Sequence, residues 1–123
     1  MEDGMTTKKI LVVDDDLSML EELKTLLEEN GFDVMTAGNG KEAIEVSKKG
    51  DFDVCLLDIK LPDCEGSDLI SMIKDNAPKA RFLLMTAYAS LSSAIKALNT
   101  GANDYIMKPF SPEYLLKSVK EAL

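Results

Sequence analysis

Acidic, hydroxyl and cationic side chains follow short apolar runs at four places in this sequence. Each apolar run has the length of a buried strand and gives way directly to polar residues. If the runs are neighbouring parallel strands, their carboxyl ends lie at one edge of a sheet, where ligands bind in such folds. The polar residues would then share one crevice. They are Asp14, Asp15, Asp16, Asp58, Thr86 and Lys108.

Several carboxylates in one crevice need a compensating positive charge. Two carboxylates roughly 4 Å apart repel each other by about 4 kcal/mol at an effective dielectric constant of 20. Mg²⁺ can relieve this repulsion, because it prefers a few carboxylate oxygens together with water and phosphate oxygens. Lys108 adds a fixed positive charge. The pattern therefore indicates a magnesium site beside a lysine.

The same groups suit phosphoryl transfer to a carboxylate. A carboxylate can attack phosphorus and form an acyl phosphate. The transfer mainly requires positioning and neutralisation of the phosphoryl oxygens, which Mg²⁺ and a lysine would supply. A threonine hydroxyl could donate a hydrogen bond to one of these oxygens. Thr86, Lys108 and the aspartates together match this task.

Strand-like and helix-like segments alternate along the whole chain. The apolar runs predict strands over residues 9–14, 32–37, 52–58, 81–85 and 104–107. Ser18 and Glu21 suggest a capping box for the first helix, and Asn30-Gly31 suggests its end. The later helices are predicted from Asn39-Gly40 to Gly50, over 67–75, across the apolar stripe at 91–98, and from Ser111-Pro112 onward.

This alternation predicts an α/β fold. Five βα units with buried strands favour a doubly wound, five-stranded parallel sheet with right-handed crossovers and helices on both faces. The expected strand order is 2-1-3-4-5, with the ligand site at the carboxyl ends near the first strand. We expect one domain over residues 8–123, preceded by a flexible segment over residues 1–7.

Composition excludes several classes of function. The chain has 123 residues, 46% of them hydrophobic, and a net charge of -8, which disfavours direct binding to nucleic acid or anionic membranes. The apolar runs are too short to span a membrane, so the expected location is the cytoplasm. Histidine is absent, which excludes Ser-His-Asp chemistry within the chain. Cys55 and Cys64 are interpreted as a buried thiol and a loop thiol rather than a disulfide pair.

Four sequence blocks resemble the signature blocks of bacterial response-regulator receiver domains of two-component signal transduction. They are Leu-Val-Val-Asp-Asp-Asp over 11–16, Leu-Leu-Asp-Ile-Lys-Leu-Pro-Asp-Cys-Glu-Gly over 56–66, Leu-Met-Thr-Ala-Tyr over 84–88, and Tyr-Ile-Met-Lys-Pro-Phe over 105–110. They occur in the family's order and spacing, and the resemblance covers essentially the whole chain. It implies the flavodoxin-like arrangement of the CheY-like superfamily.

The resemblance also implies a role for each polar residue of the predicted crevice. Asp58 would accept the phosphoryl group, and Asp14 and Asp15 would hold Mg²⁺ with it, Asp15 as a direct ligand. The backbone carbonyl of Lys60 would complete the protein ligands, and Asp16 would face the start of the first helix. The Thr86 hydroxyl would turn toward the phosphoryl group, as the matching hydroxyl does in the family.

Further implications concern the response to phosphorylation. Lys108 would bind the phosphoryl group, and Pro109 would follow a cis peptide bond. Tyr105 stands at the family's switch aromatic position, through which the charge would alter the surface of the fourth helix, fifth strand and fifth helix. The phosphoryl group would come from a partner histidine kinase or histidine phosphotransfer protein, and that surface could form a homodimer. The chain would thus be a regulatory domain, not an enzyme, although it would promote its own Mg²⁺-dependent phosphorylation and dephosphorylation.

Two positions that vary in the family are thought to tune dephosphorylation. Here they are Lys60 and Tyr88, and neither is an acidic or amide residue that would orient a water molecule. The resemblance therefore predicts a long-lived phosphorylated state.

Other interpretations of the same residues are open to test. Asp14–Asp16 could simply cap and charge a helix start. A receiver-like module could signal by contact alone, but such domains usually lose an acidic-pair residue, the acceptor or the lysine, and all are present here. Haloacid-dehalogenase-like phosphatases use an Asp-x-Asp nucleophile after the first strand, but this chain has no room for a cap module. A flavodoxin-like FMN carrier would require a phosphate loop that three aspartates would repel.

Overall fold

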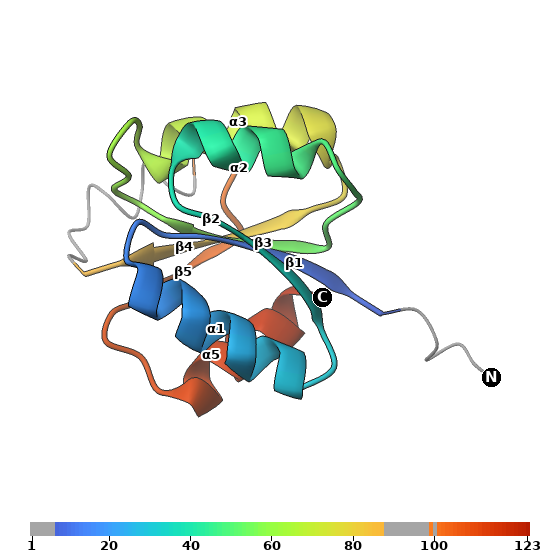
Figure 1. Ribbon diagram of the computed structural model, residues 1–123, viewed down its shortest axis with the longest axis vertical. Coiled ribbons are helices and arrows are strands. Elements are labelled where there is room, and N and C mark those ends of the chain that lie inside the picture. Colours follow the sequence, from blue (N-terminus) through green and yellow to red (C-terminus); the bar gives the residue numbers. More distant parts are fainter. Residues whose placement is uncertain (1–6, 88–98, 100) are drawn as a thin grey trace.

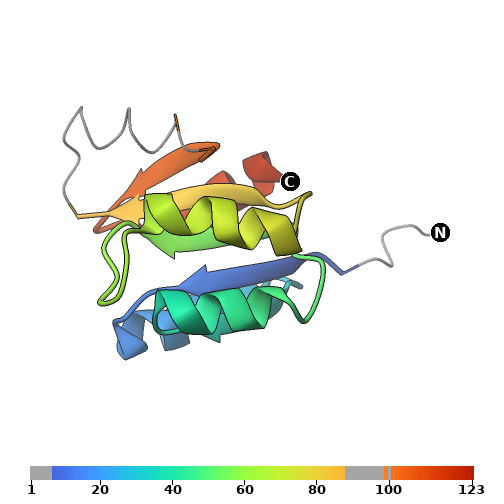
Figure 2. The same ribbon diagram turned by 90° about the horizontal axis from the view of Figure 1, so that it is seen from above.

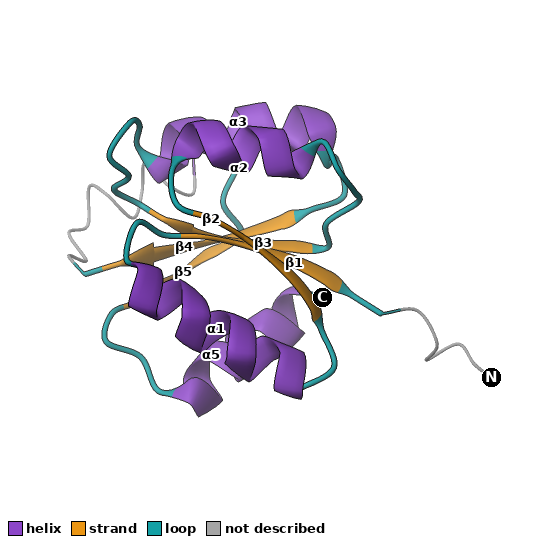
Figure 3. Cartoon of the chain, in the orientation of Figure 1, coloured by secondary structure: helices purple, strands orange, loops and turns teal. Residues whose placement is uncertain are grey.

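The computed structural model describes residues 7–87, 99 and 101–123. Within this part, strands and helices alternate around one sheet (Figures 1 and 3). The strands are β1 (Lys9–Val13), β2 (Asp33–Ala37), β3 (Val54–Asp58), β4 (Arg81–Thr86) and β5 (Asp104–Met107). The helices are α1 (Leu17–Glu29), α2 (Gly40–Ser47), α3 (Gly66–Asn76) and α5 (Pro112–Ala122).

The sheet has the predicted topology. Its five strands are parallel and lie in the order β2-β1-β3-β4-β5. This confirms the α/β prediction and the 2-1-3-4-5 order. The predicted helix across 91–98, Tyr88 and nearly all of the segment 1–7 lie outside the described residues. None of the helices in the described part has the length and apolar content needed to cross a bilayer.

The helices cover the two faces of the sheet in pairs. Figure 1 shows α2 and α3 above the sheet and α1 and α5 below it, and Figure 2 shows the same layers from above. Alternate strand residues point to opposite faces. Leu11, Leu57 and Leu84 therefore pack under α2 and α3, whereas Ile10, Val12 and Leu56 pack against α1 and α5. Burial on both faces explains why the strands are continuous apolar runs.

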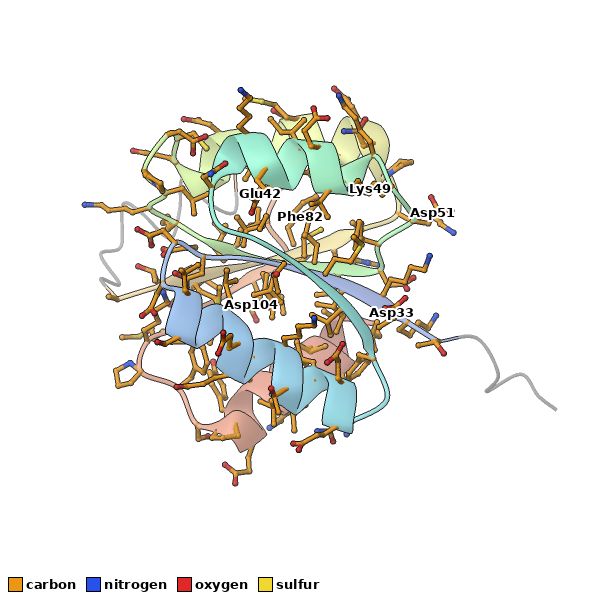
Figure 4. All side chains as sticks on the ribbon, in the orientation of Figure 1. Asp33, Glu42, Lys49, Asp51, Phe82 and Asp104 are labelled. Atoms are coloured by element: carbon orange, nitrogen blue, oxygen red, sulfur yellow. The ribbon has the colours of Figure 1, made fainter. Side chains whose placement is uncertain are left out.

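Large buried side chains fill the core on each side of the sheet. Phe82 is completely buried and lies between the sheet and the α2/α3 layer, as Figure 4 shows. Phe52 is also buried in this layer, although it precedes β3 rather than starting it as predicted. Leu115 and Val119 bury the inner face of α5 against the opposite side.

The start of α1 corrects one prediction. Asp16, and not Ser18, is the N-cap residue, and its Oδ1 accepts hydrogen bonds from the N–H groups of Ser18 and Met19. A capping box based on Ser18 and Glu21 is therefore wrong, because the helix already begins at Leu17. The predicted end at Asn30-Gly31 is confirmed, with Gly31 at a φ of 88° that favours glycine.

The other helix starts follow the predicted signals. Asn39 caps α2, and its side chain accepts from the N–H of Glu42 at 2.8 Å. Ser111 caps α5 in the same way through the N–H of Tyr114, with Pro112 in the first turn. The helix α2 ends at Ser47, before the predicted end at Gly50. These two caps fix where α2 and α5 begin, whereas the N-cap residue of α3, Glu65, makes no side-chain capping hydrogen bond.

Candidate functional site

The carboxyl end of β1 carries three aspartates with three different environments. Asp14 is completely buried, Asp15 is exposed, and Asp16 caps α1. The Oδ1 atom of Asp14 accepts a hydrogen bond of 3.0 Å from the N–H of Asp16, which holds the turn between strand and helix. Asp16 is thus used by the helix, as predicted, and the first two aspartates remain for the crevice.

The carboxyl end of β3 carries Asp58 beside these aspartates. β3 pairs with β1 and β4, so Asp58 leaves the sheet between the ends of both neighbours. Carboxylate oxygens of Asp14, Asp15 and Asp58 all lie within 4.8 Å of one another. The predicted convergence of the two strand ends is confirmed. The cluster offers three hard oxygen donors, the ligand type that Mg²⁺ or Ca²⁺ prefers.

Lys108 supplies a positive charge to two of these carboxylates. Its Nζ atom donates to Asp14 Oδ2 at 2.8 Å and lies 3.4 Å from Asp58 Oδ2. The Asp14 side chain is 1% exposed and that of Asp58 13%, so water screens these contacts poorly. The sequence predicts a lysine at the phosphoryl site, but it does not predict that Asp14 is its nearer partner.

The environment shifts the pKa values of Asp58 and Lys108. Burial raises the pKa of Asp58, and the charge of Asp14 raises it further, against the lowering effects of the Lys60 N–H and Lys108. Burial alone would lower the pKa of Lys108. The hydrogen bond and charge of Asp14, together with Asp58, outweigh that effect and raise it. The lysine therefore stays charged beside an Asp58 carboxylate whose negative charge is disfavoured without a further cation.

The loop after β3 starts from a hydrogen bond to the same carboxylate. The N–H of Lys60 donates to Asp58 Oδ1 at 3.1 Å, while the Lys60 side chain is exposed. The N–H of Ile59 donates to the carbonyl of Met85 at 2.9 Å, which extends the pairing of β3 with β4. Both bonds fix the backbone directly beside Asp58.

The ends of β4 and β5 carry the remaining predicted residues. Thr86 is 4% exposed and follows Met85, the register partner of Asp58. The N–H of Lys108 donates to the Thr86 carbonyl at 2.7 Å, which ties the two strand ends together. The peptide bond between Lys108 and Pro109 is cis, as predicted. Tyr105 is partly buried against the α2/α3 layer of the core.

One residue near this crevice has no role in the sequence-based prediction. Asp63, in the loop between β3 and α3, accepts hydrogen bonds from the N–H groups of Gly40 and Lys41 at 2.8 and 3.0 Å. The contact joins residues more than twenty positions apart, so no local motif signals it.

Comparison with known sequences gives one family over nearly the whole chain. Residues 10–120 match the response regulator receiver domain model. The chain is 40% identical over 114 residues to the transcriptional regulatory protein ZraR of Klebsiella oxytoca, covering 93% of this chain and 26% of ZraR. It is 40% identical over 119 residues to the response regulator protein PilR of Pseudomonas aeruginosa, covering 97% and 27%. The chain spans about a quarter of the length of these relatives.

Solved structures agree. A CheY-like receiver domain protein from Methanospirillum hungatei has a TM-score of 0.89 at 40% identity, over 94% of this chain and 93% of that one. The beryllofluoride-activated NtrC4 receiver domain dimer has a TM-score of 0.87 at 38% identity, over 94% and 96%. A Burkholderia pseudomallei response regulator with a phosphorylated aspartic acid, a calcium ion and citrate has a TM-score of 0.84 at 32% identity, over 93% and 71%.

Proposed function

The chain belongs to the response regulator receiver domain family, and on this premise we propose that Asp58 is the residue that accepts the phosphoryl group. Receiver domains of this family are regulatory phosphoacceptor domains of two-component systems, and so is this one. The observation that supports Asp58 is its position, 13% exposed at the end of β3, with carboxylates of Asp14 and Asp15 and the Lys108 ammonium around it.

The donor set fits a divalent cation. Clustered carboxylate oxygens are supplied by Asp14, Asp15 and Asp58, and Asp15 is the exposed member of this cluster. We propose that Mg²⁺ binds there, with the Lys60 carbonyl as a further ligand. When bound, the cation would neutralise the phosphoryl oxygens and the acidic cluster. The Burkholderia pseudomallei protein, whose structure contains a phosphorylated aspartic acid and a calcium ion, supports the proposal that a divalent cation binds to this fold.

The transfer itself is a displacement at phosphorus. An Asp58 Oδ atom forms the new O–P bond as the bond between phosphorus and the leaving group breaks, and the bonding electron pair departs with that group. The leaving group is an imidazole nitrogen of a phosphohistidine or the acetate of acetyl phosphate. The Lys108 ammonium group, 3.4 Å from Asp58 Oδ2, would form an ion pair with one phosphoryl oxygen. The Thr86 hydroxyl would donate a hydrogen bond to another.

Phosphorylation would alter the surface around β5 and α5. Thr86 and Lys108 are joined through the 2.7 Å backbone hydrogen bond, so a change at Thr86 bears directly on the end of β5. Tyr105 lies on the same strand and is partly buried, which suits a side chain that changes position with Thr86. We propose that this switch changes the α5 and β5 surface together with residues 91–98, which lie outside the described part.

The partners follow from the chemistry. The chain contains no histidine, so the phosphohistidine donor must belong to a histidine kinase or a histidine phosphotransfer protein. The NtrC4 receiver domain, whose solved structure is a dimer, supports dimerisation of this chain. We propose the face formed by the fourth helix, β5 and α5 for this contact. ZraR is a transcriptional regulatory protein, whereas the charge of -8 on this chain argues against direct DNA binding by these residues. A cytoplasmic location agrees with these partners.

The test is phosphorylation by a small donor. The protein is incubated with Mg²⁺ and acetyl phosphate, and intact mass is measured with Asp58→Asn and metal-free samples as controls. We expect one phosphoryl adduct, formed only with metal and Asp58. The absence of an adduct, together with no spectral change on adding beryllofluoride and Mg²⁺, would instead indicate a module that signals by contact alone.

A further inference from the structure

The loop between β3 and α3, which follows the phosphoacceptor, is anchored to the N-terminus of α2. Asp63 Oδ1 accepts from the N–H of Gly40 at 2.8 Å, and Oδ2 accepts from the N–H of Lys41 at 3.0 Å. These are the first two N–H groups of α2, which lack partners within the helix. Asn39 caps the third, that of Glu42. One carboxylate thus completes the capping of α2 from outside.

Charge strengthens this contact. The N-terminus of a helix carries a partial positive charge, so a carboxylate there is favoured over a neutral group. In accord with this, the hydrogen bonds from Gly40 and Lys41 lower the pKa of Asp63 below its ordinary value. Asp63 is therefore ionised at neutral pH and keeps both bonds.

The anchored loop is a short, closed hairpin. The N–H of Leu61 donates to the carbonyl of Cys64 at 3.0 Å, and Lys60 and Glu65 form an antiparallel bridge. Asp63 stands at the tip of this hairpin and Lys60 at its base. The N–H of Lys60 donates to Asp58 Oδ1 at 3.1 Å, so the base is fixed to the phosphoacceptor and the tip to α2.

The close approach of the hairpin to α2 requires a glycine. A Cβ atom at Gly40 would overlap the Cys64 Sγ atom and lie 3.1 Å from Asp63 Oδ1. Gly40 is buried, and Cys64 packs against the α2/α3 layer of the core. The hairpin therefore docks into a notch that only the smallest residue leaves open, and a larger residue would push both Asp63 and Cys64 away.

We propose that Asp63 is a positioning residue of the phosphoacceptor site: by holding the hairpin tip on α2, it keeps the Lys60 backbone beside Asp58 in the arrangement that binds the divalent cation. The inference rests on the proposed function, because it takes the Lys60 carbonyl as a metal ligand. In this role Asp63 would act through its hydrogen bonds to α2 and not as a ligand of the metal or the phosphoryl group. Its effect is transmitted through the hairpin.

Removing the anchor should weaken cation binding more than it weakens the fold. Loss of a group that orients metal ligands typically costs 10- to 100-fold in metal affinity, and Asp63 acts one step further away, so we expect about a tenfold rise in the Mg²⁺ dissociation constant for Asp63→Ala. Asp63→Asn retains one oxygen acceptor without charge and should give an intermediate value. Gly40→Ala should act in the same direction as Asp63→Ala.

The experiment compares these variants with Asp75→Ala, which removes the same charge from an exposed position of α3. Mg²⁺ affinity is measured by calorimetric titration, and the rate of phosphorylation by acetyl phosphate is measured across Mg²⁺ concentrations. We expect a higher half-saturating Mg²⁺ concentration for Asp63→Ala and Gly40→Ala, with the rate largely restored at saturating Mg²⁺. A purely structural role would lower the melting temperature and leave half-saturation unchanged.

The two proposals fail in different ways. If the wild-type protein binds Mg²⁺ and forms the adduct, but Asp63→Ala and Asp63→Asn match Asp75→Ala in half-saturation, only the role of Asp63 is overturned. If the wild-type protein itself forms no adduct, the proposed function is overturned. Far-UV circular dichroism confirms that each variant is folded, which we expect because Asp63 is exposed.

Discussion

The Lys108 ammonium group lies 2.8 Å from Asp14 Oδ2, and the two side chains are 19% and 1% exposed. The nearer partner of the lysine is thus the buried member of the acidic pair, not the proposed phosphoacceptor, whose Oδ2 atom lies 3.4 Å away. Lys108 therefore balances the buried charge of Asp14 while also lying beside Asp58. The pair is therefore central to the stability of the metal-free protein.

Removing Lys108 should destabilise the metal-free protein. Lys108→Met leaves the Asp14 carboxylate buried without its partner, and we expect a loss of about 3 kcal/mol in the free energy of unfolding. Urea denaturation at neutral pH measures it. Lys48→Met is the matched control, because it removes an exposed ion pair with Glu45 and should change stability by less than about 0.5 kcal/mol.

The alkaline limit of stability should also move in Lys108→Met. The folded-state pKa of Lys108 is raised, so its contribution is fully present below the ordinary lysine pKa and is lost as pH rises through the raised value. The difference in unfolding free energy between wild type and variant should shrink in that alkaline range. A constant difference up to the highest accessible pH would contradict the ion-pair explanation.

Asp58→Asn should stabilise the protein in the absence of a divalent cation. Burial and the charge of Asp14 raise the pKa of Asp58, so the folded state binds more protons than the unfolded chain just above the ordinary carboxyl pKa. Stability is therefore lost as pH rises through that interval, and a neutral amide escapes the loss. Thermal unfolding from acidic to neutral pH, with a chelator present, should show a higher melting temperature for the variant at neutral pH only.

Mg²⁺ should stabilise the wild-type protein far more than Asp58→Asn. At a concentration 100 times its dissociation constant, a ligand that binds only the folded state adds about 2.7 kcal/mol. Thermal unfolding with and without Mg²⁺ measures the gain, and EDTA should reverse it. An equal shift in Asp58→Asn would mean that the cation binds elsewhere.

The two cysteines should differ in reactivity toward maleimide. Cys55 is buried, and burial raises its pKa to about 12, so almost none of it is thiolate at neutral pH. Cys64 is partly exposed, although burial and the Asp63 charge raise its pKa as well. Intact mass should show slow addition of one label to the folded protein and a second label only in denaturant, and Cys64→Ser should abolish the first. Equal labelling of both thiols in the folded protein would contradict the buried position of Cys55.

The phosphorylated state should persist beyond seconds when Mg²⁺ is present and no partner is added. Lys60 is exposed two residues after Asp58 and offers no acid or amide to orient a water molecule. Lys60→Asn should therefore shorten the lifetime of the adduct, as followed by intact mass after removal of acetyl phosphate. A wild-type lifetime of seconds would contradict this prediction.

The local patterns in the sequence were sufficient to predict the elements and the sheet. Continuous apolar runs such as Ile10 to Val13 require burial on both faces, and their alternation with helices leaves a parallel, doubly wound sheet as the consistent arrangement. The polar residue at the end of each run then had to reach one edge, and the clustering of Asp14, Asp15 and Asp58 there follows from strand geometry. Ser18 and Glu21 match a capping-box pattern, but Ser and Asp are both good caps, and only the backbone conformation at Asp16 shows that Asp16 caps α1.

Only the tertiary structure decided which partners the charged side chains have. The approach of Lys108 to Asp14 joins residues 94 positions apart, and its distance depends on how the end of β5 packs beside β4. The Asp63 anchor depends in the same way on the docking of the β3–α3 hairpin into the notch at Gly40. Sequence periodicity specifies which face a residue occupies. A long-range hydrogen bond also requires that two elements lie at the correct separation, and only the packing of the folded chain sets that separation.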